Sequence, residues 1–418
     1  MLDELLDREK SGQIINVGLV GAGAMGVGIA WQVGRTPGMQ LSFIADKDQG
    51  AAEKARKASG QAKVPIFINP DRALDDTRLE LDVLVEATNT IGHAARFCIK
   101  AIERKAHVVL MNAEVDLALG VYLQHKAKEH GVVVTSDAGD QHGVLARMIE
   151  EISLWGFDIV QAGNIKGFLD RYATAETKRD IARQLNLNLI QCVAYTDGTK
   201  LNIEMALLAN GLNLLPFTPG MQGPSANHVA EALDLFDFDA YNGKGVVDYL
   251  LGSEPGGGVY VIGKCADAIQ AEYLKYYKVH NRGKYYLFYR PYHLCHIETP
   301  RAIAKACLWD RPLLTPRYGR LADVYAYAKQ SLRVGAEVAH GIGGDDFYGL
   351  IQEARQADEE GLVPISLLET DENTSRPRIL RSLKKDDPLH WSDIELADSY
   401  LLELFQEQSA VVKQRRAL

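Results

Sequence analysis

The sequence has few cysteines, no long apolar run and no excess of basic residues. The five cysteines are far apart and form no Cys-x-x-Cys pair, so neither a zinc site nor a set of disulfides is predicted. No apolar run approaches the roughly 20 residues that span a bilayer, and the acidic N-terminus has no signal-peptide core. The formal charge of −9 offers no basic face to nucleic acid. We therefore expect a cytoplasmic protein with neither membrane nor nucleic acid as a partner.

The composition is that of ordinary globular domains. Of the 418 residues, 47% are hydrophobic and 24% are charged, and this length accommodates two or three domains. Strand and helix patterns alternate through the first part of the chain, which predicts an α/β fold with a parallel, doubly wound sheet. We expect this Rossmann domain over residues 1–155, an α+β substrate and dimerisation domain over residues 156–312, and a small β-rich module over residues 313–418.

A glycine-rich turn follows the first predicted strand, residues 14–20. The spacing Gly21-x-Gly23-x-x-Gly26 leads directly into a helical pattern. In dinucleotide-binding folds the first glycine permits the turn, the second lets the backbone approach the pyrophosphate, and the third lets helix and strand pack closely. A glycine turn without a ligand is the alternative. The residues predicted to hold a nicotinamide dinucleotide here are Gly21, Ala22, Gly23, Ala24, Met25 and Gly26.

Asp46 ends the second predicted strand, residues 41–45, about twenty positions past Gly26, where an acid binds the ribose diol. A carboxylate repels a 2′-phosphate and so favours NAD. Lys47 follows directly and weakens that preference, so this end of the chain leaves NAD and NADP open.

Two further strand ends are predicted to line the coenzyme. The fourth predicted strand ends in Ala87, Thr88 and Asn89, and the fifth ends at Asn112. Ligands of a doubly wound sheet lie across the carboxyl ends of its strands. An ordinary strand-to-helix turn with Thr90 as the helix cap is the alternative.

The sixth predicted strand runs into a loop rich in polar side chains. Asp137, Asp140, Gln141 and His142 lie together in a segment that contains two glycines. Helix capping needs fewer polar groups than these four, and the loop falls at the ligand edge of the sheet. The pattern favours a functional site.

A second polar group precedes an apolar helix. Thr199 is predicted to cap this helix, and Lys200 and Glu204 are four positions apart and share a face. A surface ion pair is the alternative. Because the rest of the helix is apolar, charges at its start need partners or a ligand. We expect Lys200, Asn202 and Glu204, with Asp197 just before the helix, to belong to the active site.

The remaining elements are predicted from shorter patterns. Residues 160–167 and 190–194 are expected to be strands of a second sheet, with a helix over residues 175–184 between them. In the C-terminal module a helix is expected over residues 347–359, and a closing helix begins at Asp398.

The motifs resemble those of a known family. The known family is that of homoserine dehydrogenases, with one departure. Its members carry an Asn-Lys pair after the fifth strand, whereas Asn112 is followed here by Ala113, and this difference argues against homoserine oxidation. The whole chain resembles the 1-deoxy-D-xylulose 5-phosphate reductoisomerase-like enzymes of a homoserine-dehydrogenase-like subfamily. The first two-thirds is similar to homoserine dehydrogenases at residues 87–89, 111–116, 137–142 and 197–204, and residues 328–396 look like the SAF module found on that subfamily.

The resemblance implies a reaction and its cofactors. It implies NADPH-dependent conversion of 1-deoxy-D-xylulose 5-phosphate to 2-C-methyl-D-erythritol 4-phosphate, a step of isoprenoid precursor synthesis, with NADH as the alternative coenzyme. Both the carbon shift and the hydride transfer build negative charge on oxygen, which Mg²⁺ or Mn²⁺ would stabilise. The expected metal ligands are Asp140, Glu204 and Asp137, although Gln141 stands where the metal loop of reductoisomerases has a glutamate.

The same resemblance assigns roles to the remaining residues. Lys200 would share the oxyanion charge or bind the substrate phosphate, His142 or Asp197 would shuttle a proton, and Asn202 would orient a hydroxyl. A homodimer acting on a small phosphorylated, sugar-like substrate is expected.

Two alternatives stay open. A homoserine-dehydrogenase-like NAD(P)-dependent alcohol or hydroxy-acid dehydrogenase would use Lys200 as its proton relay and need no metal. A non-catalytic NAD(P)-sensing or carbohydrate-binding protein would tolerate the loss of Lys200.

Overall fold

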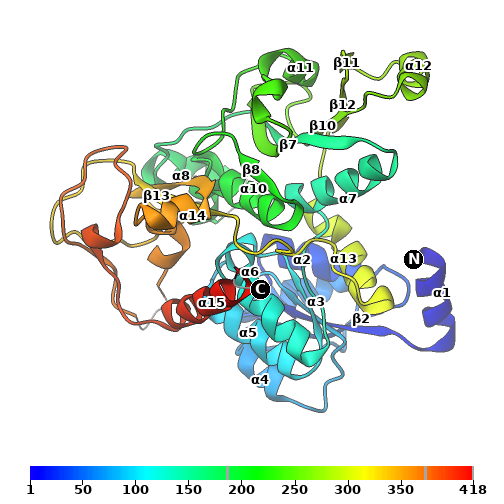
Figure 1. Cartoon of the computed structure of the whole chain (residues 1–418). Coiled ribbons are helices and arrows are strands. Elements are labelled where there is room, and N and C mark those ends of the chain that lie inside the picture. Colours follow the sequence, from blue (N-terminus) through cyan, green and yellow to red (C-terminus); the bar gives the residue numbers. More distant parts are fainter. Residues whose placement is uncertain (185–187, 371–373, 417–418) are drawn as a thin grey trace. The chain divides into compact units, whose positions relative to one another are not determined.

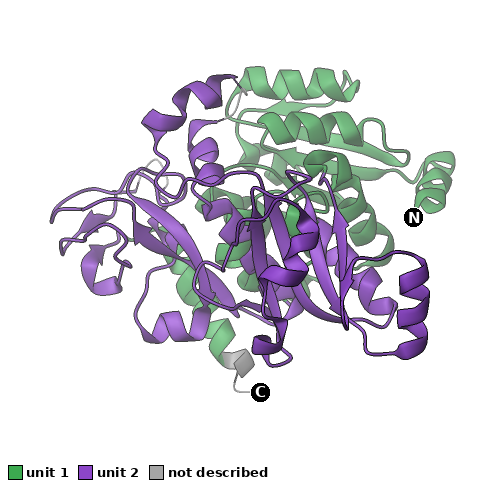
Figure 2. Cartoon of the chain, turned by 90° about the horizontal axis from the view of Figure 1, so that it is seen from above, with its two compact units in different colours: residues 1–143, 294–316, 398–418 green, residues 144–293, 317–397 purple. Residues whose placement is uncertain are grey.

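The computed structural model describes residues 1–184, 188–370 and 374–416 (Figure 1). The chain forms two compact units (Figure 2). Unit 1 comprises residues 1–143, 294–316 and 398–418, and unit 2 comprises residues 144–293 and 317–397. Each unit therefore combines segments that are distant in sequence. The division into three consecutive domains stays a prediction beside these two units.

Unit 1 is built on a six-stranded parallel sheet with the order β3-β2-β1-β4-β5-β6. The strand order reverses between β1 and β4, and this is the place where doubly wound sheets bind dinucleotides. The predicted α/β fold with an N-terminal Rossmann sheet is confirmed. The strands are β1 (Ile15–Val20), β2 (Met39–Ala45), β3 (Ile66–Phe67), β4 (Val83–Glu86), β5 (His107–Leu110) and β6 (Val134–Ser136).

Six helices of unit 1 come from its first segment. Helix α2 packs against α3, and α5 packs against α6. Asp48 caps α3 by accepting the N–H groups of Gly50 and Ala51. The helices are α1 (Leu2–Ser11), α2 (Ala24–Val33), α3 (Gln49–Ser59), α4 (Pro70–Asp75), α5 (Gly92–Glu103) and α6 (Ala113–His130).

Two later helices complete unit 1. Helix α13 (Cys295–Trp309) packs beside α2, so closely that a Cβ on Gly28 would overlap the ring of His296. Helix α15 (Tyr400–Arg416) packs beside α6. The buried Gln408 side chain accepts the Tyr122 N–H at 3.0 Å and donates to the Ala118 carbonyl at 2.7 Å. Two helices that are distant in sequence from the parallel sheet, α13 and α15, thus pack against the helices of unit 1.

Unit 2 contains a mixed six-stranded sheet with the order β11-β12-β10-β7-β9-β8. Strand β7 pairs parallel with β9 and antiparallel with β10. The strand predicted over residues 160–167 is confirmed as β7. The strands are β7 (Asp158–Lys166), β8 (Leu214–Pro216), β9 (Gly245–Leu251), β10 (Val259–Lys264), β11 (Asn281–Arg282) and β12 (Tyr285–Arg290).

The strand expected over residues 190–194 is wrong. These residues form helix α9 (Leu189–Thr196), which begins after Asn188, whose side chain accepts the Ile190 and Gln191 N–H groups at 3.0 and 3.3 Å. Periodicity alone does not distinguish a helix from a strand in such a short apolar run. The asparagine cap stabilises the start of a helix and so favours the helix here. The other α-helices with described residues in the first segment of unit 2, residues 144–293, are α7 (Gln141–Leu154), α8 (Ala175–Gln184), α10 (Thr199–Leu212), α11 (Ala232–Leu235) and α12 (Ala268–Tyr276).

The helix expected over residues 347–359 is wrong in its first half. Strand β14 (Phe347–Glu353) pairs antiparallel with β13 (Ala322–Ala328), and only α14 (Ala354–Glu359) is helical. Both strands pack on α10. Short strands β15 (Arg378–Ile379) and β16 (Ile394–Glu395) complete the described part of this segment. Within the described residues, no helix combines the length and apolarity that crossing a bilayer requires.

Candidate coenzyme and substrate sites

The glycine turn of unit 1 has the geometry predicted for it. Gly21 has a φ of +95°, and a Cβ there would lie 2.5 Å from the Ala87 carbonyl oxygen. A Cβ on Gly26 would overlap the carbonyl oxygen of Gly21. Gly23 is exposed, and a Cβ there would meet nothing within 4 Å. The turn is therefore tightly packed at its first and third glycines and open at its second, where a pyrophosphate would lie.

Helix α2 starts from this turn without a side-chain cap. Its N-cap is Gly23, which offers no oxygen to the first N–H groups of the helix. Unbonded N–H groups at a helix start attract phosphate oxygens. The residues fit a dinucleotide, whose pyrophosphate would be held by the turn from Gly21 to Gly26.

Asp46 lies beside the glycine turn, as its spacing predicts. Its carboxylate accepts the Ala22 N–H at 2.6 Å and the Asp48 N–H at 2.8 Å, and the residue is half-buried. Lys47 is exposed. A half-buried carboxylate at the end of β2 is placed to accept a ribose hydroxyl, whereas the choice between NAD and NADP stays a prediction.

The ends of β4 and β5 hold the other predicted coenzyme residues. Ala87 and Thr88 are half-buried and Asn89 is exposed. Asn112 caps α6 by accepting the Glu114 and Val115 N–H groups, and it donates to the Thr90 carbonyl at 2.7 Å. Asn112 is thus engaged in holding the backbone around the strand ends, while its coenzyme contact stays a prediction. Thr90 does not cap α5, whose N-cap is Ile91.

The acidic segment after β6 is partly helical. Gln141 and His142 are buried and lie in the first turn of α7 instead of in a loop. Asp137 is buried and accepts the Gly139 N–H at 2.6 Å, and burial together with the nearby charge of Asp140 raises its pKa to about 7. Asp140 is half-buried. A carboxyl that titrates near neutrality can exchange protons at the pH of a cell.

The second predicted cluster lies in unit 2, at the start of α10. Lys200 and Glu204 are both half-buried, and Glu204 accepts a hydrogen bond from Asn164 at 3.2 Å. Asn164 and Lys166 are buried at alternate positions of β7, with the Lys166 ammonium 4.4 Å from the centre of the Tyr195 ring. Sequence reasoning missed these two residues, although polar side chains two positions apart lie on the same face of a strand and were a visible signal.

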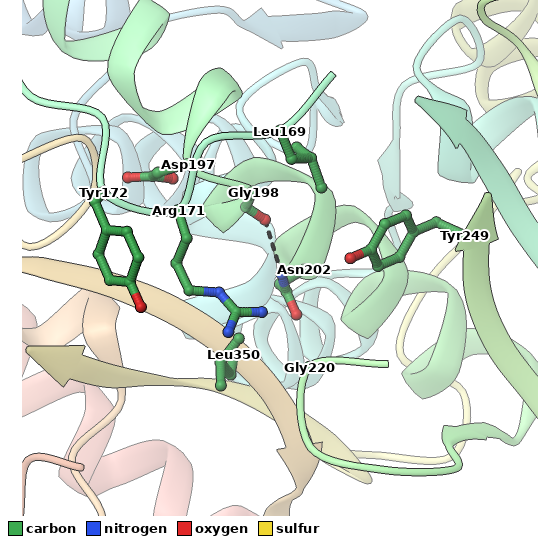
Figure 3. A pocket seen from close by; sticks show the side chains of 9 residues that line it. All are labelled: Leu169, Arg171, Tyr172, Asp197, Gly198, Asn202, Gly220, Tyr249 and Leu350. Atoms are coloured by element: carbon green, nitrogen blue, oxygen red, sulfur yellow. Dashed lines mark hydrogen bonds between the residues drawn. The ribbon is translucent and has the colours of Figure 1, made fainter. Parts of the chain in front are cut away.

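A cavity of about 250 Å³ opens within unit 2 (Figure 3). The guanidinium of Arg171 and the hydroxyl of Tyr249 point into the same space. Among the described residues, no carboxylate pairs with Arg171 and no group bonds the Tyr249 hydroxyl. Both groups donate hydrogen bonds, so the cavity suits a ligand rich in acceptors. It is lined by Leu169, Arg171, Tyr172, Asp197, Gly198, Asn202, Gly220, Tyr249 and Leu350.

Asp197 and Asn202 line this cavity, but both bind protein groups. Asn202 donates to the Gly198 carbonyl at 2.8 Å (Figure 3) and accepts the Ile351 N–H at 2.9 Å. Asp197 accepts the Thr199 N–H at 2.8 Å and lies 2.8 Å from the ammonium of Lys329. Burial raises the pKa of Asp197, and Lys329 opposes that shift. The helix is capped by Gly198 instead of Thr199, whose hydroxyl accepts the Gly349 N–H at 2.9 Å.

The predicted catalytic and metal residues are divided between the units. Asp137, Asp140 and His142 belong to unit 1, whereas Asp197, Lys200, Asn202 and Glu204 belong to unit 2. Each subset is gathered within its own unit. That the two subsets form one active site, and that Asp137, Asp140 and Glu204 bind one metal ion, stay predictions.

Two family models match consecutive parts of the chain. Residues 21–136 match the model described as Homoserine dehydrogenase, NAD binding domain, and residues 139–299 match the model described as Oxidoreductase DRL, catalytic domain. No curated protein sequence matches the chain. With the glycine turn and the strand order, these matches define the class: the chain is an NAD(P)-dependent oxidoreductase. Residues 21–136 are thus similar to an NAD-binding domain, and residues 139–299 are similar to an oxidoreductase catalytic domain.

Solved dehydrogenase structures are similar to the chain at low identity. The WlbA dehydrogenase from Bordetella pertussis, in complex with NADH and UDP-GlcNAcA, is 22% identical over 41% of this chain, with a TM-score of 0.29. The chain spans 50% of that protein. A probable dehydrogenase from Thermotoga maritima is 12% identical over 71% of this chain and 90% of its own, with a TM-score of 0.44. Likeness at this level says nothing about the substrate.

Proposed function

We propose that the chain is a homoserine-dehydrogenase-like NAD(P)-dependent dehydrogenase that acts on a small hydroxylated substrate with an acidic group. The observation that carries this proposal is the glycine turn, which is packed at Gly21 and Gly26 and open at Gly23, within a segment that matches an NAD-binding family model. The acidic group is inferred from the donors of Arg171 and Tyr249 in the cavity of unit 2.

The polar cluster at the start of α10 supports a role for Lys200 in proton transfer. Oxidation of an alcohol gives up a hydride from carbon and a proton from oxygen. Lys200 is half-buried and four positions before Glu204 on the same helix, and Glu204 accepts a hydrogen bond from Asn164 at 3.2 Å. In this proposal Lys200 takes the proton from the substrate oxygen or returns it.

We predict that Lys200→Ala abolishes turnover while NADPH still quenches the protein fluorescence. The coenzyme turn lies in unit 1, so its binding should survive the change in unit 2. Lys275→Ala, at an exposed position of α12, is the control and should leave turnover unchanged. Wild-type turnover in Lys200→Ala would remove this residue from the mechanism.

A second candidate function is the conversion of 1-deoxy-D-xylulose 5-phosphate and NADPH to 2-C-methyl-D-erythritol 4-phosphate and NADP. Ala113, which stands where homoserine dehydrogenases have lysine, supports it. Asp140, Glu204 and Asp137 offer the oxygen ligands that Mg²⁺ or Mn²⁺ prefers. The divalent metal, the role in isoprenoid synthesis and the SAF-like nature of the tail belong to this candidate.

One substrate panel separates the two candidates. The full chain is incubated with NADPH and either 1-deoxy-D-xylulose 5-phosphate or aspartate semialdehyde, and with NADP⁺ and homoserine, each with Mg²⁺, with Mn²⁺ and with EDTA. Oxidation of NADPH by the deoxyxylulose phosphate alone, lost in EDTA, supports the second candidate. Metal-independent turnover of another substrate supports the first. Coenzyme binding without any turnover would support an NAD(P)-sensing protein, which is the remaining alternative. The homodimer and the cytoplasmic location are proposals that sedimentation and cell fractionation would test.

A further inference from the structure

Lys329 is a buried lysine just after β13, with its side chain 1% exposed. Its ammonium donates to the Ala173 carbonyl and to the Gly344 carbonyl, both at 2.7 Å, and lies 2.8 Å from the carboxylate of Asp197. The ammonium thus makes two hydrogen bonds to backbone carbonyls, and its third close contact is the ion pair with Asp197. The charge is compensated by Asp197, whose side chain is fully buried.

The three acceptors belong to three walls of the cavity, whose remaining lining residues, Gly220 and Tyr249, lie on other segments. Ala173 continues the segment that carries Arg171 and Tyr172, and Asp197 itself lines the cavity at the start of α10. Gly344 lies just before β14, which supplies Leu350 (Figure 3). A single side chain therefore joins all three walls.

Neighbouring contacts fix the same segments to each other. The Gly349 N–H donates to the Thr199 hydroxyl, and the Ile351 N–H donates to the side-chain oxygen Oδ1 of Asn202, each at 2.9 Å. A Cβ on Gly343 would overlap the Ile190 carbonyl oxygen of α9. Residues 343–351 thus lie directly against α9 and the first turn of α10.

We propose that Lys329 is a positioning residue for the substrate cavity. In this proposal the C-terminal segment of unit 2 that contains Lys329 helps to form the cavity and is not a separate module. Without the ammonium, two buried carbonyls lose their donor and a buried carboxylate loses its counter-charge, so the three walls lose their common anchor. The kinetic part of the test rests on the proposed function, whereas the structural part does not.

The test uses the full chain with Lys329→Met, which keeps the length of the side chain and removes its charge and donors. A second variant, Lys329→Met with Asp197→Asn, also removes the unpaired buried charge and guards against failure to fold. Amide hydrogen exchange should speed up about tenfold or more in residues 171–173, 197–202 and 344–350 together. For any substrate that the panel shows to be turned over, KM should rise by about tenfold, more than kcat falls.

Lys178→Met is the matched control. Lys178 is also buried in unit 2, and its ammonium lies 3.5 Å from the carboxylate of Asp170 and 5.4 Å from the centre of the Phe168 ring. Its exchange changes should be confined to the neighbourhood of Asp170. Exchange in Lys329→Met that changes in only one of the three segments, or rises evenly through unit 2, would overturn the proposal. A chain with the expected exchange pattern but no active substrate would contradict the proposed function alone.

Discussion

Single buried carboxyl groups give the ligand edge of unit 1 its acid-base properties. Glu86, Asp116 and Asp137 are buried near the ends of β4, β5 and β6, and burial raises the pKa of each to about 7. Glu86 accepts the Thr88 N–H at 2.9 Å, and the Ser136 hydroxyl donates to Asp116 at 2.5 Å. These bonds favour the ionised forms, but desolvation outweighs them.

We predict that Asp116→Asn flattens the pH dependence of stability. A carboxyl with a raised pKa holds its proton more tightly in the folded state than in the unfolded state. Its contribution to the free energy of unfolding is therefore fully present below the usual aspartate pKa of 3.8, and it is lost as the pH rises to about 7. For a shift of this size the loss is of the order of a few kcal/mol. The wild-type melting temperature should therefore fall more steeply than that of Asp116→Asn between about pH 5 and pH 8. Asp3→Asn, at an exposed position, should keep the wild-type slope. Equal slopes for all three proteins would contradict the assignment.

Arg171 is the residue on which recognition of an acidic substrate group should depend. Replacing its guanidinium by an amide in Arg171→Gln removes the positive charge from the cavity, so KM for an acidic substrate should rise by about tenfold or more, whereas NADPH affinity should not change. Initial rates over a range of substrate concentrations would measure this. Arg179→Gln, at an exposed position of α8, is the control. The inference fails if KM is the same in both variants.

At the level of secondary-structure elements, local pattern predicted the parallel sheet of unit 1 because strands such as β4 and β5 are largely buried apolar runs, each followed by a helix. The pattern was misleading where distant contacts decide. Residues 347–353 form a strand because they pair with β13 and bond Thr199 and Asn202, and such partners cannot be read from spacing.

The same limit applies to the sites. Asp46 and the glycines could be predicted because their roles depend on a short motif. Arg171 and Tyr249 could not, because they meet only after β9 and the segment after β7 are brought together. The place of Asn112 at a strand end led to its prediction as a coenzyme ligand. The structure adds that its side chain caps α6, and this role depends on backbone groups that the strand pattern does not indicate.

The glycine turn allows a prediction that separates binding from folding. In Gly26→Ala the new methyl group overlaps the Gly21 carbonyl oxygen, so both the melting temperature and NADPH affinity should fall. In Gly23→Ala the methyl group meets no protein atom, so the melting temperature should not change. The same methyl group would block the approach of the pyrophosphate, so NADPH affinity should fall. Thermal melts and fluorescence titrations would measure the two effects. Undiminished NADPH affinity in Gly23→Ala would argue against a pyrophosphate at this turn.

At the scale of the whole molecule, unit 1 depends on a helix that is distant in sequence. Gln408 bonds the backbone of α6 at two buried points. We predict that Gln408→Ala lowers the free energy of unfolding by ~1–3 kcal/mol, because a buried donor and a buried acceptor lose their partners. Denaturant unfolding, followed together with NADPH binding, would measure it. Gln406→Ala, two positions away and exposed, should have little effect. Equal stability of the two variants would show that α15 is only loosely attached.

The interleaving of the units has a consequence for biosynthesis. Because unit 1 takes its first residues from the start of the chain and its last helix from residues 400–416, a ribosome delivers one face of α6 about 280 residues before the helix that covers it. A nascent chain must keep that apolar surface from aggregating while all of unit 2 is translated. Unit 1, whose first residues are translated first, is therefore complete only after unit 2 has been translated.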